Sequence, residues 1–110
     1  MILAIATLAL APWTGPDLKA SATAQAKYRL TISAPANSSV RLHAENVSTG
    51  WIAAFCNGRV CSPNQVTQAI PASGKVEIQF ELIREEDNAP RTSGATIKTD
   101  DGASLVVKPQ

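Results

Sequence analysis

The sequence is poor in the residues that metal and redox centres need. It has two cysteines, one histidine and one methionine among its 110 residues. A closed zinc site needs about four ligands, and a blue-copper site needs two histidines beside its cysteine. His43 is the single histidine. We therefore expect neither a bound metal nor any other cofactor.

Long apolar runs and clusters of positive charge are also missing. The apolar run near the start, MILAIATLALAP, has about ten apolar residues and is too short to span a bilayer. Ten basic residues are nearly balanced by nine acidic ones. A surface for nucleic acid or anionic lipid needs clustered positive charge. We expect no nucleic-acid partner and membrane contact only during export.

Catalytic signatures are equally scarce. No serine stands in a G-x-S-x-G elbow. A nucleophilic triad would need His43 as its base, and His43 falls on the polar side of its predicted strand, where an exposed residue is ordinary. We predict that the chain is not an enzyme.

The first 26 residues have the pattern of a secretory signal peptide. The apolar run is followed by small residues, and two stretches, ASA and AQA, fit the small-x-small pattern of a cleavage site. No Lys or Arg precedes the run, so the amino terminus supplies the only positive charge there. We predict a leader over 1–26, cut after Ala22 or Ala26, and a secreted or periplasmic domain over 27–110.

The rest of the chain alternates between apolar and polar residues with a period of two. KVEIQFEL, residues 75–82, is the clearest case. Such alternation indicates antiparallel strands with one buried face, and the Asp-Gly pair at 101–102 predicts a hairpin turn. With turn signals every eight to twelve residues, we predict an all-β, antiparallel, immunoglobulin-like sandwich of about seven strands.

The apolar positions of this alternating pattern predict the core. Its expected members are Tyr28, Leu30, Ile32, Val40, Leu42, Trp51, Phe55, Val76, Ile78, Phe80, Leu82, Ile97 and either Leu105 with Val107 or Val106.

The two cysteines are expected to form a disulfide, because an even count in an exported protein favours one. If residues 58–59 form a two-residue turn, Cys56 lies opposite Cys61 in a non-hydrogen-bonded pair that a disulfide bridges. If residues 57–58 form the turn, Cys56 faces Arg59 and the alignment fails. We predict a structural staple at a hairpin tip, which contributes about 2 kcal/mol.

Two other hypotheses use polar residues. A periplasmic thiol-disulfide protein would use Cys56 and Cys61, with Arg59 as a nearby cation that lowers a thiol pKa. The usual C-x-x-C at a helix start is absent. Calcium would bind between neighbouring loops if the acidic run 85–87 met the acidic pair 100–101.

One stretch resembles a known class of domain. Trp51 opens a strand, FC and CSP flank a short loop, and PASG precedes an alternating strand that ends in IQFEL. This pattern resembles the immunoglobulin-like or fibronectin-type-III-like modules of exported bacterial proteins, over most of 28–107. The resemblance implies an exported accessory or adhesive module with Trp51 as the core tryptophan of the third strand. Unlike antibody domains, the chain has no distant cysteines to link the sheets.

The function that we expect is a small exported, non-catalytic binding or structural module. Such a module contacts a protein or cell-surface partner through end loops or by adding a partner's strand to a sheet edge. The loops 35–39 and 84–93 are candidate surfaces. The hairpin tip is a third one, made of Asn57, Gly58, Arg59 and Val60.

Overall fold

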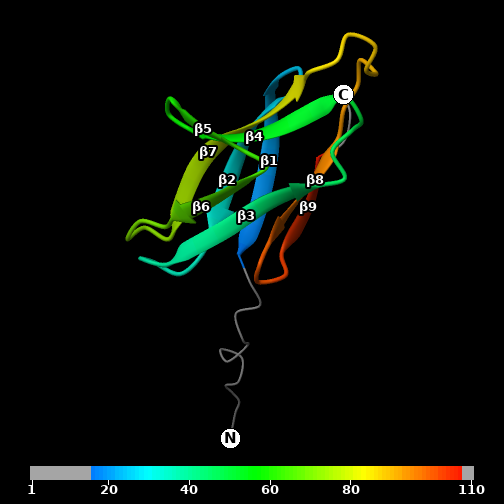
Figure 1. Cartoon of the computed structure of the whole chain (residues 1–110). Helices are drawn as coiled ribbons and strands as arrows, with labels where there is room; N and C mark the ends of the chain where they lie inside the picture. Colours follow the sequence, from blue (N-terminus) through cyan, green and yellow to red (C-terminus); the bar gives the residue numbers. More distant parts are fainter. Residues whose placement is uncertain (1–15, 108–110) are drawn as a thin grey trace, which may run out of the picture.

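The computed structural model describes residues 16–107, which fold as two antiparallel sheets packed face to face (Figure 1). The strands in chain order are β1 (Asp17–Ala24), β2 (Lys27–Ser33), β3 (Ser39–Glu45), β4 (Trp51–Asn57), β5 (Val60–Pro63), β6 (Gln65–Ala69), β7 (Lys75–Arg84), β8 (Ala95–Thr99) and β9 (Ser104–Val107). The predicted all-β antiparallel sandwich is confirmed, with nine strands instead of about seven. No helix capable of crossing a membrane occurs within residues 16–107.

The strand order defines two sheets of unequal width. One sheet has the order β1-β2-β7-β4-β5, and the other has the order β6-β3-β8-β9. The order β1-β2-β7-β4 corresponds to the ABED sheet of an immunoglobulin-type sandwich, and the order β3-β8-β9 corresponds to its CFG sheet. β5 and β6 are the additions to that plan. They follow each other in the chain, and each forms the edge of a different sheet.

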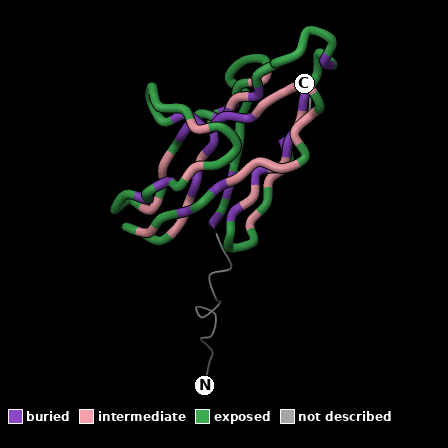
Figure 2. The backbone as a smooth tube through the Cα atoms, viewed as in Figure 1, coloured by how far each residue is buried: buried purple, intermediate pink, exposed green. Residues whose placement is uncertain are grey.

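The core lies between the sheets, where the inward face of each strand meets its counterpart. Buried residues alternate with exposed ones along most strands (Figure 2). The expected core residues that are buried are Tyr28, Leu30, Ile32, Val40, Leu42, Phe55, Ile78, Phe80, Leu82, Ile97 and Val107. The rings of Phe55 and Phe80 lie 5.0 Å apart, centroid to centroid, across the β4–β7 pair. Val106 is exposed, so the face of Leu105 and Val107 is the inward one.

Trp51 departs from the prediction. It opens β4, the fourth strand, and packs against the core while partly exposed. Its indole Nε1 donates a hydrogen bond to the carbonyl oxygen of Pro90 at 2.8 Å. An indole N–H needs a polar partner when its ring is covered, and this partner lies in the loop at the end of the sandwich. Trp51 therefore anchors that loop at the rim of the core.

β1 lies within the segment that the sequence predicts to be a leader. Residues 1–15 of that leader lie outside the described residues, but β1 pairs with β2 in register from Asp17↔Ser33 to Ala24↔Lys27. Leu18 is buried in the core, while the other side chains of β1 are exposed. The leader over 1–26 remains a prediction. Cleavage after Ala22 or Ala26 would remove this strand from the sheet.

Candidate functional site

The two cysteines lie opposite each other in the β4–β5 hairpin. The register pairs Cys56 with Cys61 and Asn57 with Val60, and the two sulfurs form a disulfide. Gly58 has a φ of +65°, and Arg59 is not among the described residues with positive φ. A positive φ at the first central position alone is the pattern of a type II′ hairpin turn. The predicted staple and its turn at 58–59 are confirmed.

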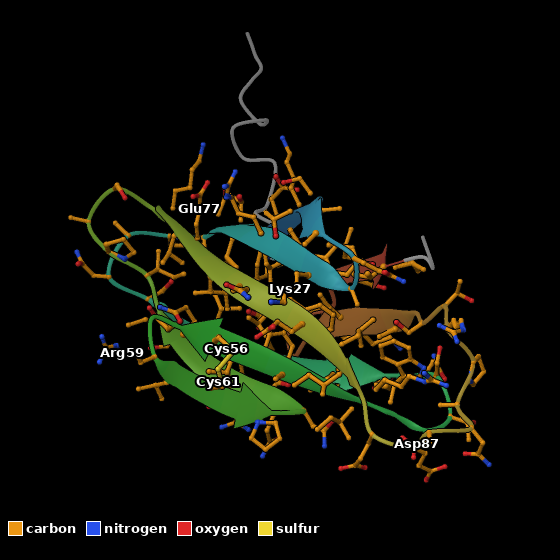
Figure 3. The ribbon with its side chains drawn as sticks, turned by 90° about the horizontal axis from the view of Figure 1, so that it is seen from above. Lys27, Cys56, Arg59, Cys61, Glu77 and Asp87 are labelled. Atoms are coloured by element: carbon orange, nitrogen blue, oxygen red, sulfur yellow. A yellow bond between two sulfur atoms is a disulfide. The ribbon has the colours of Figure 1, made fainter. Side chains whose placement is uncertain are left out.

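The disulfide lies on the outer face of the five-stranded sheet (Figure 3), and a carboxylate lies next to it. Cys56 is buried, with 4 % of its surface exposed, whereas Cys61 is exposed. Glu81 of β7 places Oε2 3.5 Å from the Cys56 Sγ, and its Oε1 lies 3.8 Å from the Lys27 Nζ. A disulfide sulfur carries no proton, so the contact between Cys56 and Glu81 is a close approach of oxygen to sulfur and not a hydrogen bond.

Sequence reasoning missed Glu81 because the neighbourhood depends on strand pairing. Glu81 lies 20 residues beyond Cys61, and only the pairing of β4 with β7 brings it close. The alternation of β7 places Glu81 on the outer face, but it does not say which strand lies beside it.

The hairpin tip projects into solvent. Val60 is 71 % exposed, and Arg59 points away from the sheet (Figure 3). One polar contact ties the tip's base to the opposite sheet, because the Asn57 Nδ2 donates to the Oε1 of Gln68 at 3.2 Å. Gln68 lies in β6 and is buried, and its own Nε2 donates to the carbonyl oxygen of Ala69. The staple and this bridge give the hairpin a defined position relative to β6.

A hollow of about 400 Å³ lies between β5 and β6, the edge strands of the two sheets. We call this side of the domain the open side of the sandwich. Its lining is largely apolar and includes the core residues Phe55 and Ile78, together with Val60 and Val66. Among residues 16–107, no charged side chain lines it. The hollow therefore lies against buried core residues, and a small apolar group fits its chemistry.

The three candidate surfaces do not form one patch. The registers of β2 with β7 and of β4 with β7 place the loop 35–39 and the hairpin tip at the same end of the sandwich. The loop 84–93 lies at the other end, where β7 finishes and Arg84 pairs with Trp51. Any binding surface that includes the tip therefore excludes the loop 84–93.

The acidic residues proposed for calcium are also separated. The run 85–87 follows β7, and the pair 100–101 follows β8, which runs the length of the sandwich in between. Within the described part of the chain, the one group of three metal-ligating side chains is Cys56, Cys61 and Glu81. The hypothesis of a shared calcium site at these two acidic segments is wrong, because antiparallel topology puts them at opposite ends of one strand.

His43 lies on the outer face of the four-stranded sheet. Its Nε2 lies 2.8 Å from the Glu45 Oε2, and the Lys98 Nζ lies 3.1 Å from the Glu45 Oε1. The hydrogen bond from His43, followed by that from Lys98, holds the pKa of the Glu45 carboxyl below its usual value. This group is a surface charge network on β3 and β8.

No family model, no curated protein and no solved structure matches the chain.

Proposed function

We propose that the chain is a small exported, non-catalytic binding module that accepts an extended peptide strand along the free edge of β6. The disulfide indicates an oxidising environment, and export to the periplasm or the outside of the cell provides one. The observation that carries the proposal is that β6 is an edge strand without charged residues or proline and has an apolar hollow beside it.

The edge of β6 presents unpaired backbone groups to a partner. The carbonyl oxygen of Asn64 accepts from the Ala44 N–H, and the Ile70 N–H donates to the carbonyl oxygen of Ser38. Backbone groups alternate in direction along a strand. The N–H and C=O groups of residues 65, 67 and 69 therefore face away from β3, and among them the carbonyl oxygen of Ala69 already accepts from the Gln68 Nε2.

This edge lacks the devices that usually block strand addition. Natural edges carry Lys, Pro or inward charges, but the sequence of β6, QVTQA, has no charge and no proline. β1 carries Asp17 and Lys19, and β5 ends in Pro63. By this criterion β6 is a better template for an added strand than β1 or β5, and β9, with the sequence SLVV, is as free of charge and proline as β6.

The hollow provides a place for the partner's side chains. In strand addition, main-chain hydrogen bonds supply affinity and pockets for alternate side chains supply specificity. The hollow beside β6 is lined by Val60, Val66 and core residues, so it suits apolar groups. The staple holds β5 in position before binding, which lowers the entropy lost on association.

The occupant that fits is an extended peptide with apolar residues at alternate positions and an acidic residue at one end. Arg59 at the tip makes no hydrogen bond or ion pair among the described residues. Arg41 lines an adjoining hollow, with its guanidinium 3.6 Å from the Asp100 carboxylate. Asp100 offsets the charge of Arg41, so the unpaired positive charge next to the edge is that of Arg59.

The thiol-disulfide alternative gains no support from this geometry. Attack by a thiol on the exposed Cys61 releases Cys56 as a thiolate, and Glu81 lies 3.5 Å from that sulfur. A neighbouring carboxylate disfavours a thiolate, so Cys56 is a poor leaving group.

Selection of a random decapeptide library on the folded domain tests the proposal. We expect the selected peptides to share an alternating apolar pattern and an acidic end. Thr67→Pro removes an outward N–H without touching the bonds to β3, because proline lacks that donor. It should abolish peptide binding, while Thr67→Ala should leave binding intact.

Two outcomes count against the proposal. One is a library from which no peptide binds the domain. The other is a selected peptide that binds Thr67→Pro as tightly as the wild type, since such a peptide does not use the backbone of β6.

A further inference from the structure

We infer that the reduced hairpin is a binding site for one thiophilic divalent cation, such as Zn²⁺ or Cd²⁺, held by Cys56, Cys61 and Glu81. This site does not use the edge of β6, because its ligands come from β4, β5 and β7, although Cys56 also lines the hollow beside that edge. The Sγ atoms and a carboxylate oxygen all lie within 4.8 Å of one another.

The spacing between Cys56 and Glu81 already suits a tetrahedral metal. Bonds of about 2.3 Å to sulfur and about 2.1 Å to oxygen, at a tetrahedral angle, separate the two ligand atoms by roughly 3.5 Å. The Cys56 Sγ and the Glu81 Oε2 lie 3.5 Å apart. The two sulfurs must move apart to about 3.8 Å once their bond is broken, and the exposed Cys61 is the side chain that rotation can move.

The electrostatics of the reduced site favour a cation. Two thiolates and one carboxylate converge there, and Lys27 contacts only the other oxygen of Glu81, at 3.8 Å. A divalent cation relieves this repulsion at the position where the three ligands meet. Cys56 is buried while Cys61 is exposed, so the fourth coordination position faces solvent and suits a water molecule.

The scaffold of the site does not depend on the disulfide. β4 pairs with β7 from Trp51↔Arg84 to Cys56↔Gln79, and this pairing positions Glu81 beside Cys56. The turn at Gly58 closes the hairpin from its own backbone geometry. Reduction therefore leaves the three ligands on neighbouring paired strands.

The chemistry balances with an external phosphine and water. The phosphine gives two electrons to the S–S bond and becomes a phosphine oxide with the oxygen of one water molecule, whose two protons yield two thiols. The cation then displaces both thiol protons, so binding releases protons and strengthens as the pH rises.

The experiment is an anaerobic titration of the full chain with Cd²⁺, after reduction by a phosphine and removal of the reagent. Thiolate-to-cadmium absorption reports binding at sulfur, and Co²⁺ spectra report tetrahedral geometry. We expect one ion per reduced chain and none at sulfur in the oxidised chain. Cys61→Ser should abolish binding. Glu81→Gln should weaken it at least about tenfold, because even outer-shell partners of a metal contribute that much.

Glu77→Gln is the matched control, because Glu77 lies on the same face of β7 and pairs with Arg29. It should bind Cd²⁺ as the wild type does. Equal affinity for wild type and Glu81→Gln would overturn the inference, and so would a reduced chain that has lost its β-sheet circular dichroism or that binds no cadmium.

Discussion

Breaking the disulfide should lower the free energy of unfolding by about 2 kcal/mol. Cys56 and Cys61 are five positions apart, so the closed ring is very short. The chain-entropy relation gives a loss of about 7 cal/mol/K for such a ring, which is about 2 kcal/mol at room temperature. In a domain of this size, that difference corresponds to a drop of about 8–16 °C in Tm.

Urea denaturation of the oxidised and the phosphine-reduced wild type measures this difference. Reduction is preferable to substitution, because Cys56 is buried and a smaller side chain would add a cavity cost. The midpoint should fall while the transition stays cooperative.

Two results would refute the reasoning. A change below about 0.5 kcal/mol, the size of an ordinary surface effect, would mean that the unfolded chain is not restrained by the bond. Loss of the folded state on reduction would mean that the turn and the β4–β7 pairing do not hold the hairpin.

Three further perturbations follow from the contacts. Glu45→Gln should reduce the loss of stability in acid, because the hydrogen bond from His43 lowers the pKa of Glu45 in the folded state. The stability that the Glu45 carboxylate contributes is present above its unfolded-state pKa and is lost as the pH falls through its folded-state pKa. Urea midpoints measured as a function of pH test this. Gly50→Ala should cost about 1–3 kcal/mol in thermal unfolding, because φ is +83° and a Cβ would lie 2.5 Å from the Ala89 Cβ. Glu81→Gln should speed reduction by dithiothreitol about threefold, because it removes a charge that opposes the leaving thiolate.

Two of these have a matched control, and the third has a result that would contradict it. Gly102→Ala introduces backbone strain with no atom within 4 Å of the new Cβ, so it should cost less than Gly50→Ala; an equal cost would mean that the contact with Ala89 is unimportant. Glu77→Gln should leave the reduction rate unchanged. An unchanged pH profile in Glu45→Gln would show that the network with His43 does not stabilise the fold.

The sheet faces and the hairpin register were predictable because both rest on local rules. Alternation assigned the inward residues of β2 and β7, and the bridging distance of a disulfide selected the turn at 58–59. Trp51 was misplaced because its position depends on a loop that arrives much later in the chain and accepts its N–H.

The open side of the sandwich was beyond sequence reasoning. Whether β5 and β6 join one sheet or two depends on long-range pairing, and their divergence after Pro63 creates the hollow. β1 was missed because its small residues satisfy the pattern of a cleavage site and only Leu18 is a large apolar residue.

The contribution of β1 to the stability of the domain can be measured. A chain that begins at Lys27 should be less stable to urea than one that begins at Asp17, by about 2 kcal/mol, the value of burying one leucine. Equal stability would mean that β2 does not need β1 at its edge.

The most direct test of the central proposal is amide hydrogen exchange of the domain with and without a selected peptide. An added strand bonds to the outward groups of β6, so the amides of residues 65, 67 and 69 should exchange more slowly in the complex. The amides of residues 66 and 68 already face β3 and should change little. Protection confined to the hairpin tip 57–60 or to the loop 84–93, with none at residues 65, 67 and 69, would contradict the proposal that this chain binds its partner by strand addition.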